Sequence, residues 1–190
     1  MTKEEIIEQT STQFEKIKSI TITMDDAFFF TKPSNKWSVA DNVKHLLIST
    51  NISALAFWLP KFLVRWIGGV PNRPSKTFEE LVNKYTLKLA EGGVAKGRFV
   101  PKLNKNLTSK DRLLKQWNKV STHYLDSLEK NKTEEDLDNF LIKHPLLGKI
   151  TLRELCYFTI YHTQHHIKII TDIKIYKGHC WDAGIKWRAI

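Results

Sequence analysis

The chain has 190 residues, of which 42% are apolar and 26% charged, and its formal net charge is +10 at pH 7. This composition is ordinary for a soluble globular protein, and the length suits one domain, so residues 1–190 are taken as a single domain. The positive charge permits a nucleic-acid partner, a membrane surface, or simply a lysine-rich exterior.

The sequence predicts no signal peptide, no membrane span and no CxxC motif. The N-terminal sequence MTKEEIIEQT is charged and predicts no signal peptide. The most apolar stretch, residues 52–70, is interrupted by a proline and two basic residues, which argues against a membrane span. The two cysteines, Cys156 and Cys180, lie far apart without a CxxC motif. We therefore expect a protein of the reducing cytoplasm with no membrane partner.

The N-terminal part predicts two helices. Residues 3–24 have apolar side chains at helical spacing, with Glu and Lys between them. Pro-Ser-Asn at 33–35 marks a loop. The second helix begins after Ser38, which forms a capping box with Asp41, and Pro60 is expected to kink or end it.

The second predicted helix carries a histidine within an apolar stripe. Steps of three and four residues connect His45 to the positions on either side of it, namely Asp41, Ile48, Ile52, Leu55 and Leu59. His45 therefore occupies a position where leucine would be expected, one turn from the polar end of the helix.

Two more helices are predicted before the C-terminal third. Thr77 caps a helix that ends near Ala90, and Ser109 caps another that ends near Glu129. Residues 91–108, between them, form a long loop with three glycines, a proline and several basic side chains. A short segment, 133–142, follows, and no segment strongly predicts a β-strand.

The last predicted helix, residues 151–174, is the centre of the site hypothesis. Thr151 and Glu154 form its capping box, and neither proline nor glycine interrupts it. Its apolar seam contains His162 and His166. Residues four apart on a helix project from the same face, so both imidazoles can reach one ion.

These patterns predict an all-α protein, a bundle of four or more helices with additional short helices and a long basic loop. Residues 179–190 show no periodicity and are expected to pack across the bundle. No repeat, low-complexity tract or linker divides the chain.

In such a bundle, facing helices can bring His45 together with His162 and His166. Three imidazoles suit Zn²⁺, and also Ni²⁺, Co²⁺ or Fe²⁺, and leave at least one coordination position open. The alternative is that they are hydrogen-bonded core residues, although paired imidazoles in an apolar seam are costly to satisfy without a metal or a network. Asp41 is a candidate for orienting a ligating ring, beside its capping role, and His165 for a neighbouring or surface position.

Two segments resemble the DinB/YfiT-like family of bacterial four-helix-bundle metalloproteins. In residues 36–50, KWSVADNVKHLLIST, Trp-Ser precedes a helix that carries a histidine. In residues 144–170, HPLLGKITLRELCYFTIYHTQHHIKII, His-Pro, Gly and Thr-Leu-Arg-Glu lead into HxxxH. The resemblance implies a DinB-like four-helix bundle, frequent homodimers, and one divalent ion, with zinc or nickel expected. The positions that match the family's three metal ligands are His45, His162 and His166.

The resemblance also implies a class of reaction. Characterised branches of the family are thiol-dependent transferases, which use bacillithiol, mycothiol or glutathione, and a maleylpyruvate isomerase. Our leading hypothesis is a metal-dependent S-transferase, in which the ion activates a bacillithiol-like low-molecular-weight thiol for attack on a small electrophile. The basic loop 96–105 is a candidate for holding the carboxylates of such a thiol.

Two alternatives belong to other classes. A metal-dependent hydrolase would use metal-bound water, but no glutamate lies in or beside the HxxxH sequence, unlike in HExxH. A non-catalytic nucleic-acid-binding or stress-response protein fits the charge and the six tryptophans. No helix-turn-helix or zinc-finger spacing supports it, so nucleic acid is not the expected partner. Cys156 is interpreted as a small core residue rather than a nucleophile.

Overall fold

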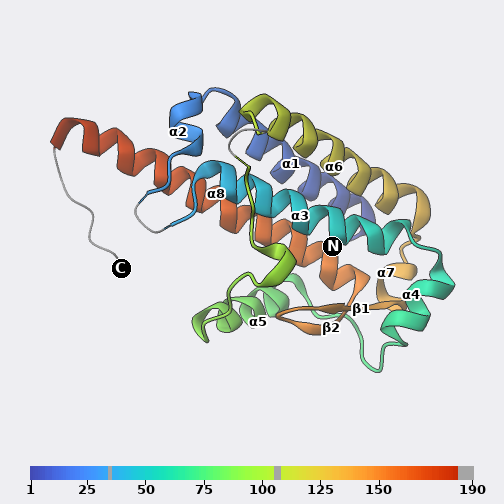
Figure 1. The fold of residues 1–190 in the computed structure, drawn as a ribbon. Coiled ribbons are helices and arrows are strands. Elements are labelled where there is room, and N and C mark those ends of the chain that lie inside the picture. The colour runs from blue at the N-terminus through green and yellow to red at the C-terminus, as the bar shows by residue number, and fades with distance from the viewer. Residues whose placement is uncertain (34–35, 105–107, 184–190) are drawn as a thin grey trace.

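A computed structural model describes residues 1–33, 36–104 and 108–183, with side chains described as far as residue 175. Its long helices are α1 (Lys3–Ile22), α3 (Val39–Trp58), α6 (Lys110–Asn131) and α8 (Leu152–Ala183). Helices α1 and α3 each contact both α6 and α8, so the four surround a common core (Figure 1). The predicted four-helix bundle is confirmed.

Shorter elements cover the ends of the bundle. They are α2 (Asp26–Phe30), α4 (Lys61–Gly68), α5 (Phe78–Ala90), the 3₁₀ turn η1 (Gly97–Phe99), α7 (Asp136–Asn139), β1 (Leu141–His144) and β2 (Gly148–Thr151). The strands pair antiparallel, with Leu141 opposite Thr151. This hairpin was not predicted, because four-residue strands are too short to show alternation.

Side-chain capping fixes where the site helices begin. At α3, Ser38 Oγ accepts from the Asp41 amide at 3.0 Å, and the Asp41 carboxylate accepts from the Ser38 amide at 2.9 Å. The same reciprocal bonds join Thr151 and Glu154 at the start of α8. These capping boxes confirm the predicted starts and set the rotational position of each histidine.

The chain turns sharply after α3. Pro60 precedes α4, whose axis lies at 114° to that of α3. Gly68 lets α4 approach β1 closely, because a Cβ there would lie 1.6 Å from the carbonyl oxygen of Leu141. No single helix in the described ranges is long and apolar enough to cross a bilayer, and only the bent pair α3–α4 meets that test by length and composition.

The buried face of α3 differs from the predicted stripe. Leu55 is 47% exposed, and Ile48 and Ile52 are only half-buried. The helix instead buries the neighbouring face, which carries Val39, Val43, Leu46, Thr50 and Phe57. The prediction was wrong because α3 is apolar on two faces, and sequence periodicity cannot say which one packs. His45 lies at the edge between them and is 6% exposed.

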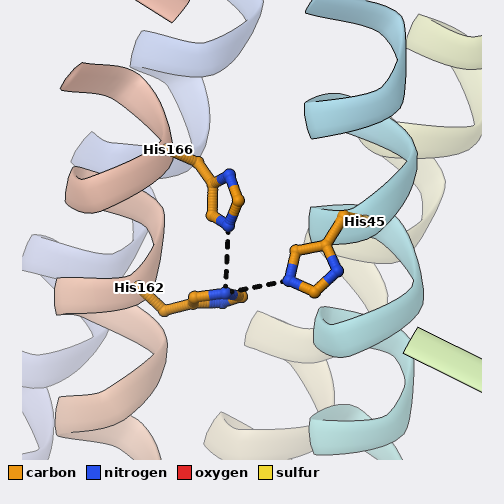
Figure 2. A group of neighbouring side chains, drawn as sticks. All are labelled: His45, His162 and His166. Carbon is orange, nitrogen blue, oxygen red and sulfur yellow. Dashed lines mark hydrogen bonds between the residues drawn. The ribbon is translucent and has the colours of Figure 1, made fainter. Parts of the chain in front are cut away.

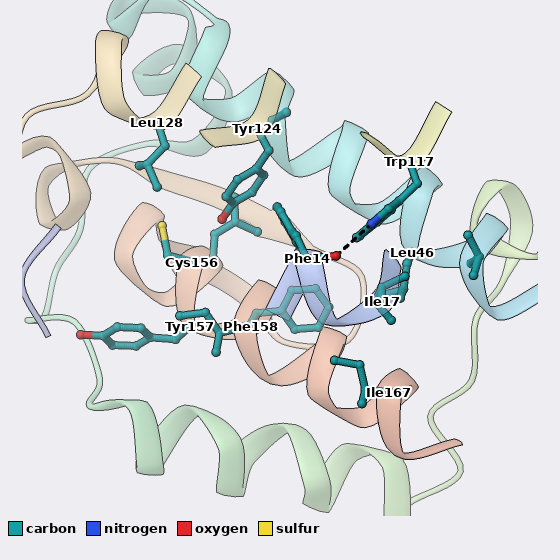
Figure 3. Packing of buried hydrophobic residues seen from close by; sticks show 14 of the residues in the cluster. Phe14, Ile17, Leu46, Trp117, Tyr124, Leu128, Cys156, Tyr157, Phe158 and Ile167 are labelled. Carbon is teal, nitrogen blue, oxygen red and sulfur yellow. Dashed lines mark hydrogen bonds between the residues drawn. The ribbon is translucent and has the colours of Figure 1, made fainter. Parts of the chain in front are cut away.

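Aromatic side chains fill the centre of the bundle (Figure 3). Phe14 of α1 makes edge-to-face contacts with Trp117 and Tyr124 of α6, at ring-centroid distances of 5.1 and 5.5 Å. Trp117 Nε1 donates to the Phe14 carbonyl at 3.2 Å. Cys156 lies in the same core, and burial raises the pKa of its thiol to about 12, which agrees with its interpretation as a core residue.

Helix α8 extends further than predicted. It continues through Gly178 to Ala183, so residues 179–183 are helical rather than packed across the bundle (Figure 1). Glycine is unfavourable within a helix by only about 1 kcal/mol, which a long helix tolerates. The rest of the predicted tail, 184–190, lies outside the described residues.

Candidate metal centre

Two helices distant in sequence bring three histidines together. His45 on α3 faces His162 and His166 on α8 (Figure 2). The ring centroids are 5.0 Å apart for His45 and His162, 4.9 Å for His45 and His166, and 4.7 Å for His162 and His166. Each residue is at most 6% exposed. The juxtaposition expected from the sequence is therefore present.

The same nitrogen of each ring points to the centre of the group. His162 Nε2 lies 3.1 Å from His45 Nε2 and 3.2 Å from His166 Nε2. All three candidate ligand atoms lie within 4.8 Å of one another. Nitrogens bound about 2.1 Å from a tetrahedral ion lie about 3.4 Å apart. A small adjustment of the rings would thus accommodate one ion.

Hydrogen bonds on the far side of two rings determine their tautomers. His45 Nδ1 donates to the Phe99 carbonyl at 2.7 Å. His166 Nδ1 donates to Asn42 Oδ1 at 2.7 Å, and the amide orientation is set because Asn42 Nδ2 donates to the Ser38 carbonyl. With Nδ1 protonated in both neutral rings, both Nε2 atoms carry lone pairs.

This arrangement fits a metal ion better than a hydrogen-bond network. The Nε2 lone pairs of His45 and His166 both point at His162 Nε2, which has at most one proton to donate. Without an ion, at least one of these buried lone pairs therefore has no hydrogen-bond donor, which is unfavourable. An ion at the centre would accept all three lone pairs.

Burial keeps the three rings neutral. It lowers the pKa of His162 and His166 well below the usual value near 6.5, and nearby histidines lower both further. Burial also lowers the pKa of His45, more than the bond to Phe99 raises it. Only neutral imidazole binds a metal, so the group is ready to act as ligand at neutral pH.

Aromatic side chains surround the group. Phe158 stacks on His162 at 4.8 Å, and Trp37 lies 5.0 Å from the His45 ring and 6.3 Å from the His166 ring. These contacts restrict ring rotation and limit access of water. They also lower the local dielectric, which strengthens interactions with any charge at the centre.

The two candidates for a supporting role differ: Asp41 contacts none of the three rings, whereas His165 lies beside His166. The Asp41 carboxylate accepts from Ser38 and lies 3.3 Å from Lys32 Nζ, so its contacts belong to the helix cap. Asn42, the next residue, is the one that binds His166. His165 is half-buried beside His166, with ring centroids 5.3 Å apart.

The sequence interpretation missed three residues that support the rings: Trp37, Asn42 and Phe99. Asn42 had a detectable signal, because it lies three residues before His45 and therefore beside it on the helix. Trp37 belongs to the Trp-Ser pair that resembles the family, but nothing in the local sequence indicates that its ring packs against two histidines. Phe99 acts through its carbonyl, which any residue supplies, so no side-chain pattern could reveal it.

The fold and the site together define a class of protein, a four-helix bundle with a buried three-histidine group of the kind that holds a metal ion between facing helices. The model of the DinB superfamily matches residues 9–170, and the chain belongs to this superfamily. No curated protein sequence matches it significantly.

Two solved structures share the fold. TT2238, a four-helix bundle protein, is 13% identical with a TM-score of 0.57, over 90% of this chain and 99% of that one. YfiT from Bacillus subtilis is 20% identical with a TM-score of 0.62, over 93% of this chain and 87% of that one. YfiT is described as a probable metal-dependent hydrolase with an unusual four-helix bundle topology. At these identities the likeness shows the fold alone.

Proposed function

We propose that this protein is a divalent-metal-dependent enzyme whose ion is held by His45, His162 and His166. The observation that supports this most strongly is the convergence of three Nε2 atoms, two of which have their lone pairs fixed by bonds at Nδ1. The description of YfiT as metal-dependent supports it further. Zinc or nickel is the expected occupant, because imidazole nitrogen suits both.

The proposed reaction is transfer of a whole low-molecular-weight thiol, through its sulfur atom, to a small electrophile. An ion held by His45, His162 and His166 would supply Lewis acidity, which would lower the pKa of a thiol bound to it. The sulfur forms a bond to an electrophilic carbon, the leaving group departs with its electron pair, and the thiol proton passes to solvent. The chain itself supplies neutral ligands in fixed orientations and an aromatic surrounding.

Neither the capping carboxylates of the ligand helices nor Tyr85 is available as a general base for activating water. Activation of water for hydrolysis usually requires a general base. On the ligand helices, the carboxylates of Asp41 and Glu154 are already engaged, by Ser38 and by Arg73 respectively. Tyr85, whose ring lies 6.3 Å from that of His162, retains its proton because burial raises its pKa to about 12. A thiol that loses its proton on binding requires no such base.

Metal-dependent hydrolysis is the second candidate, because YfiT carries that description and shares this fold. The two candidates differ in what the reaction consumes. The rate of thiol transfer depends on the concentration of added thiol, whereas hydrolysis proceeds without thiol. An assay with and without thiol, on a chromogenic aryl halide and a chromogenic ester, separates them.

The first experiment measures metal content and activity in the same preparation. Protein purified without a nickel resin is analysed for its elements, then assayed with neutral and acidic thiols. We expect about one divalent ion per chain, thiol-dependent turnover of the aryl halide, and loss of both in His162→Ala. The matched control is His123→Ala on the exposed side of α6.

Two results would contradict the proposal. Metal content below about one ion per ten chains, even in protein supplied with zinc, would refute the proposed metal site. Equal thiol-dependent turnover by metal-free protein would leave the site in place but refute the mechanism.

A further inference from the structure

A cavity between α3 and the loop that includes η1 is lined by basic side chains. Its volume is about 250 Å³, and its walls are Lys44, Ile48, Gly97, Arg98, Val100 and Lys102. We refer to it as the cationic pocket. Helix α3 and this loop pass side by side in Figure 1.

Within the described part of the chain, the three basic side chains of this pocket have no acidic partner. Lys44, Arg98 and Lys102 form no ion pair with any residue that the structure describes. The sequence from 92 to 110 contains no Asp or Glu. Three cations gathered around one concavity concentrate a positive potential that attracts anions.

Residues on both walls of the pocket are sequence neighbours of His45 or of Phe99, whose carbonyl holds the Nδ1 side of the His45 ring. On α3, Lys44 directly precedes His45 and Ile48 lies one turn beyond it. On the loop, Arg98 precedes Phe99, whose carbonyl accepts the bond from His45 Nδ1. Gly97, at φ +56°, begins the tight turn that places both residues. The same turn therefore orients a candidate ligand and carries a basic side chain into the pocket.

The size of the pocket restricts what it can hold. A volume of about 250 Å³ is below the roughly 300–1,000 Å³ of pockets that enclose a whole small-molecule ligand. It is sufficient for a group of a few atoms, such as two carboxylates on adjacent carbons or one phosphate. The remainder of the molecule would extend outside it.

We propose that the cationic pocket binds the anionic end, carboxylate or phosphate, of the molecule whose thiol meets the metal. Arg98 offers a planar pair of donors that matches such oxygens, and the two lysines contribute charge. This inference rests on the proposed function, and it adds that a neutral thiol is a poor substrate and an acidic one is preferred.

The test compares thiols that differ in charge, on full-length protein loaded with Co²⁺. Mercaptosuccinate carries a thiol and two carboxylates, 2-mercaptoethanol carries no charge, and succinate and inorganic phosphate lack sulfur. The absorption spectrum of cobalt reports sulfur coordination, and calorimetry reports binding. The pocket variant is Arg98→Gln with Lys102→Gln. The control, Lys143→Gln with Lys149→Gln, removes the same charge from the exposed face of the β-hairpin, where these two residues lie opposite each other.

We expect the pocket variant to bind mercaptosuccinate about tenfold more weakly or worse, since charge-assisted hydrogen bonds are lost. Its affinity for 2-mercaptoethanol and its cobalt content should not change, and the control should match the wild type. Succinate and phosphate are compared by calorimetry. The one that binds more tightly, and that loses affinity in the Arg98 variant, shows whether the anionic end is a carboxylate or a phosphate.

Failure of the inference is distinguishable from failure of the function. Equal binding of mercaptosuccinate and 2-mercaptoethanol, or equal weakening by both double variants, would show that the pocket has no specific role. A cobalt–sulfur absorption band in the same experiment would still support binding of the thiol to the metal. If no thiol changes the cobalt spectrum, the thiol chemistry fails. Arg98-sensitive binding of succinate or phosphate would then still support the pocket as an anion site.

Discussion

The behaviour of each ring depends on which of its nitrogens carries the proton. In His45 and His166 that choice is imposed from outside, by the Phe99 carbonyl and by Asn42. A ring held in this way presents its lone pair without reorganisation when an ion arrives. The supporting residues should therefore affect metal affinity although they do not touch the ion.

Asn42→Ala tests this at one residue. The substitution removes the acceptor for His166 Nδ1, so that ring is free to adopt the other tautomer and to rotate. We expect the affinity for zinc to fall about tenfold to a hundredfold, measured by competition with a chromophoric chelator. Asn51→Ala, on the exposed side of the same helix, is the control. Equal affinities of Asn42→Ala and wild type would show that the bond does not orient the ring.

Residue spacing predicted the histidine group but not what supports it. His162 and His166 could be paired from sequence because a helix alone fixes their relation. His45 lies 117 residues from His162 and could be added only by its apolar surroundings and by family resemblance. The contact with Phe99 depends on how a glycine-containing loop folds onto α3, a tertiary feature with no local pattern.

Among the elements, the start of α8 is held by a buried carboxylate. The Glu154 side chain is fully buried, and it accepts two bonds from Arg73, at 2.6 and 2.9 Å, and one each from the amides of Lys76 and Thr151. Burial alone would raise the pKa of Glu154, but these bonds lower it overall. The helix that carries two histidines is thereby joined to the segment before α5.

Arg73→Ala should destabilise the fold markedly. It leaves the Glu154 carboxylate buried without its charged partner, which typically costs about 3–5 kcal/mol. Urea unfolding at pH 7 measures the loss. Lys168→Ala breaks the exposed pair with Asp172 and should change stability by less than about 1 kcal/mol. If both variants lose a similar free energy of unfolding, the pair of Arg73 and Glu154 stabilises the fold no more than an exposed ion pair does.

The β-hairpin contributes a pH-dependent element. His144 Nδ1 accepts from the amides of Leu146 and Leu147 in the turn, both at 3.2 Å. Burial, with a smaller effect from Lys84, lowers the pKa of His144 to about 4. The unfolded chain, with a value near 6.5, binds more protons between pH 6.5 and 4, so stability falls as the pH is lowered through that window.

His144→Asn should reduce this pH dependence, because asparagine retains an acceptor for the turn but does not titrate. We expect the loss of stability between pH 7.5 and 5 to be smaller by about 2 kcal/mol than in the wild type, measured by urea unfolding of metal-free protein. The same substitution at His123 controls for removal of a histidine as such. An unchanged pH dependence in His144→Asn would show that the ring is not the titrating group.

Capping explains why the sequence predicted the helices better than their packing. Reciprocal bonds at Ser38, Thr77 and Thr151 involve residues three apart, so they are visible in the sequence. The face that α3 buries is decided by its packing, chiefly against α6, which leaves Val43 and Leu46 buried and Leu55 exposed. The hairpin likewise forms because β1 has α4 to pack against.

For the whole molecule, an ion at the histidine group would add a cross-link between α3 and α8, which already pack against each other and share the hydrogen bond between Asn42 and His166. The unfolded chain does not preserve this group, so an ion bound there stabilises the folded state in proportion to its saturation. At free zinc about a hundredfold above the dissociation constant, the gain is about 2.7 kcal/mol.

In a chain of this length, that gain corresponds to a rise in Tm of about 5–10 °C. Thermal unfolding with chelator and with buffered zinc measures it. We expect no rise in His162→Ala and, at limiting zinc, a smaller rise in Asn42→Ala than in the wild type. Because α3 and α8 would be joined only if the ion binds ligands on both, His45→Ala must remove the rise as completely as His162→Ala does. A rise that survives in His45→Ala would place the zinc on α8 alone, or elsewhere on the protein.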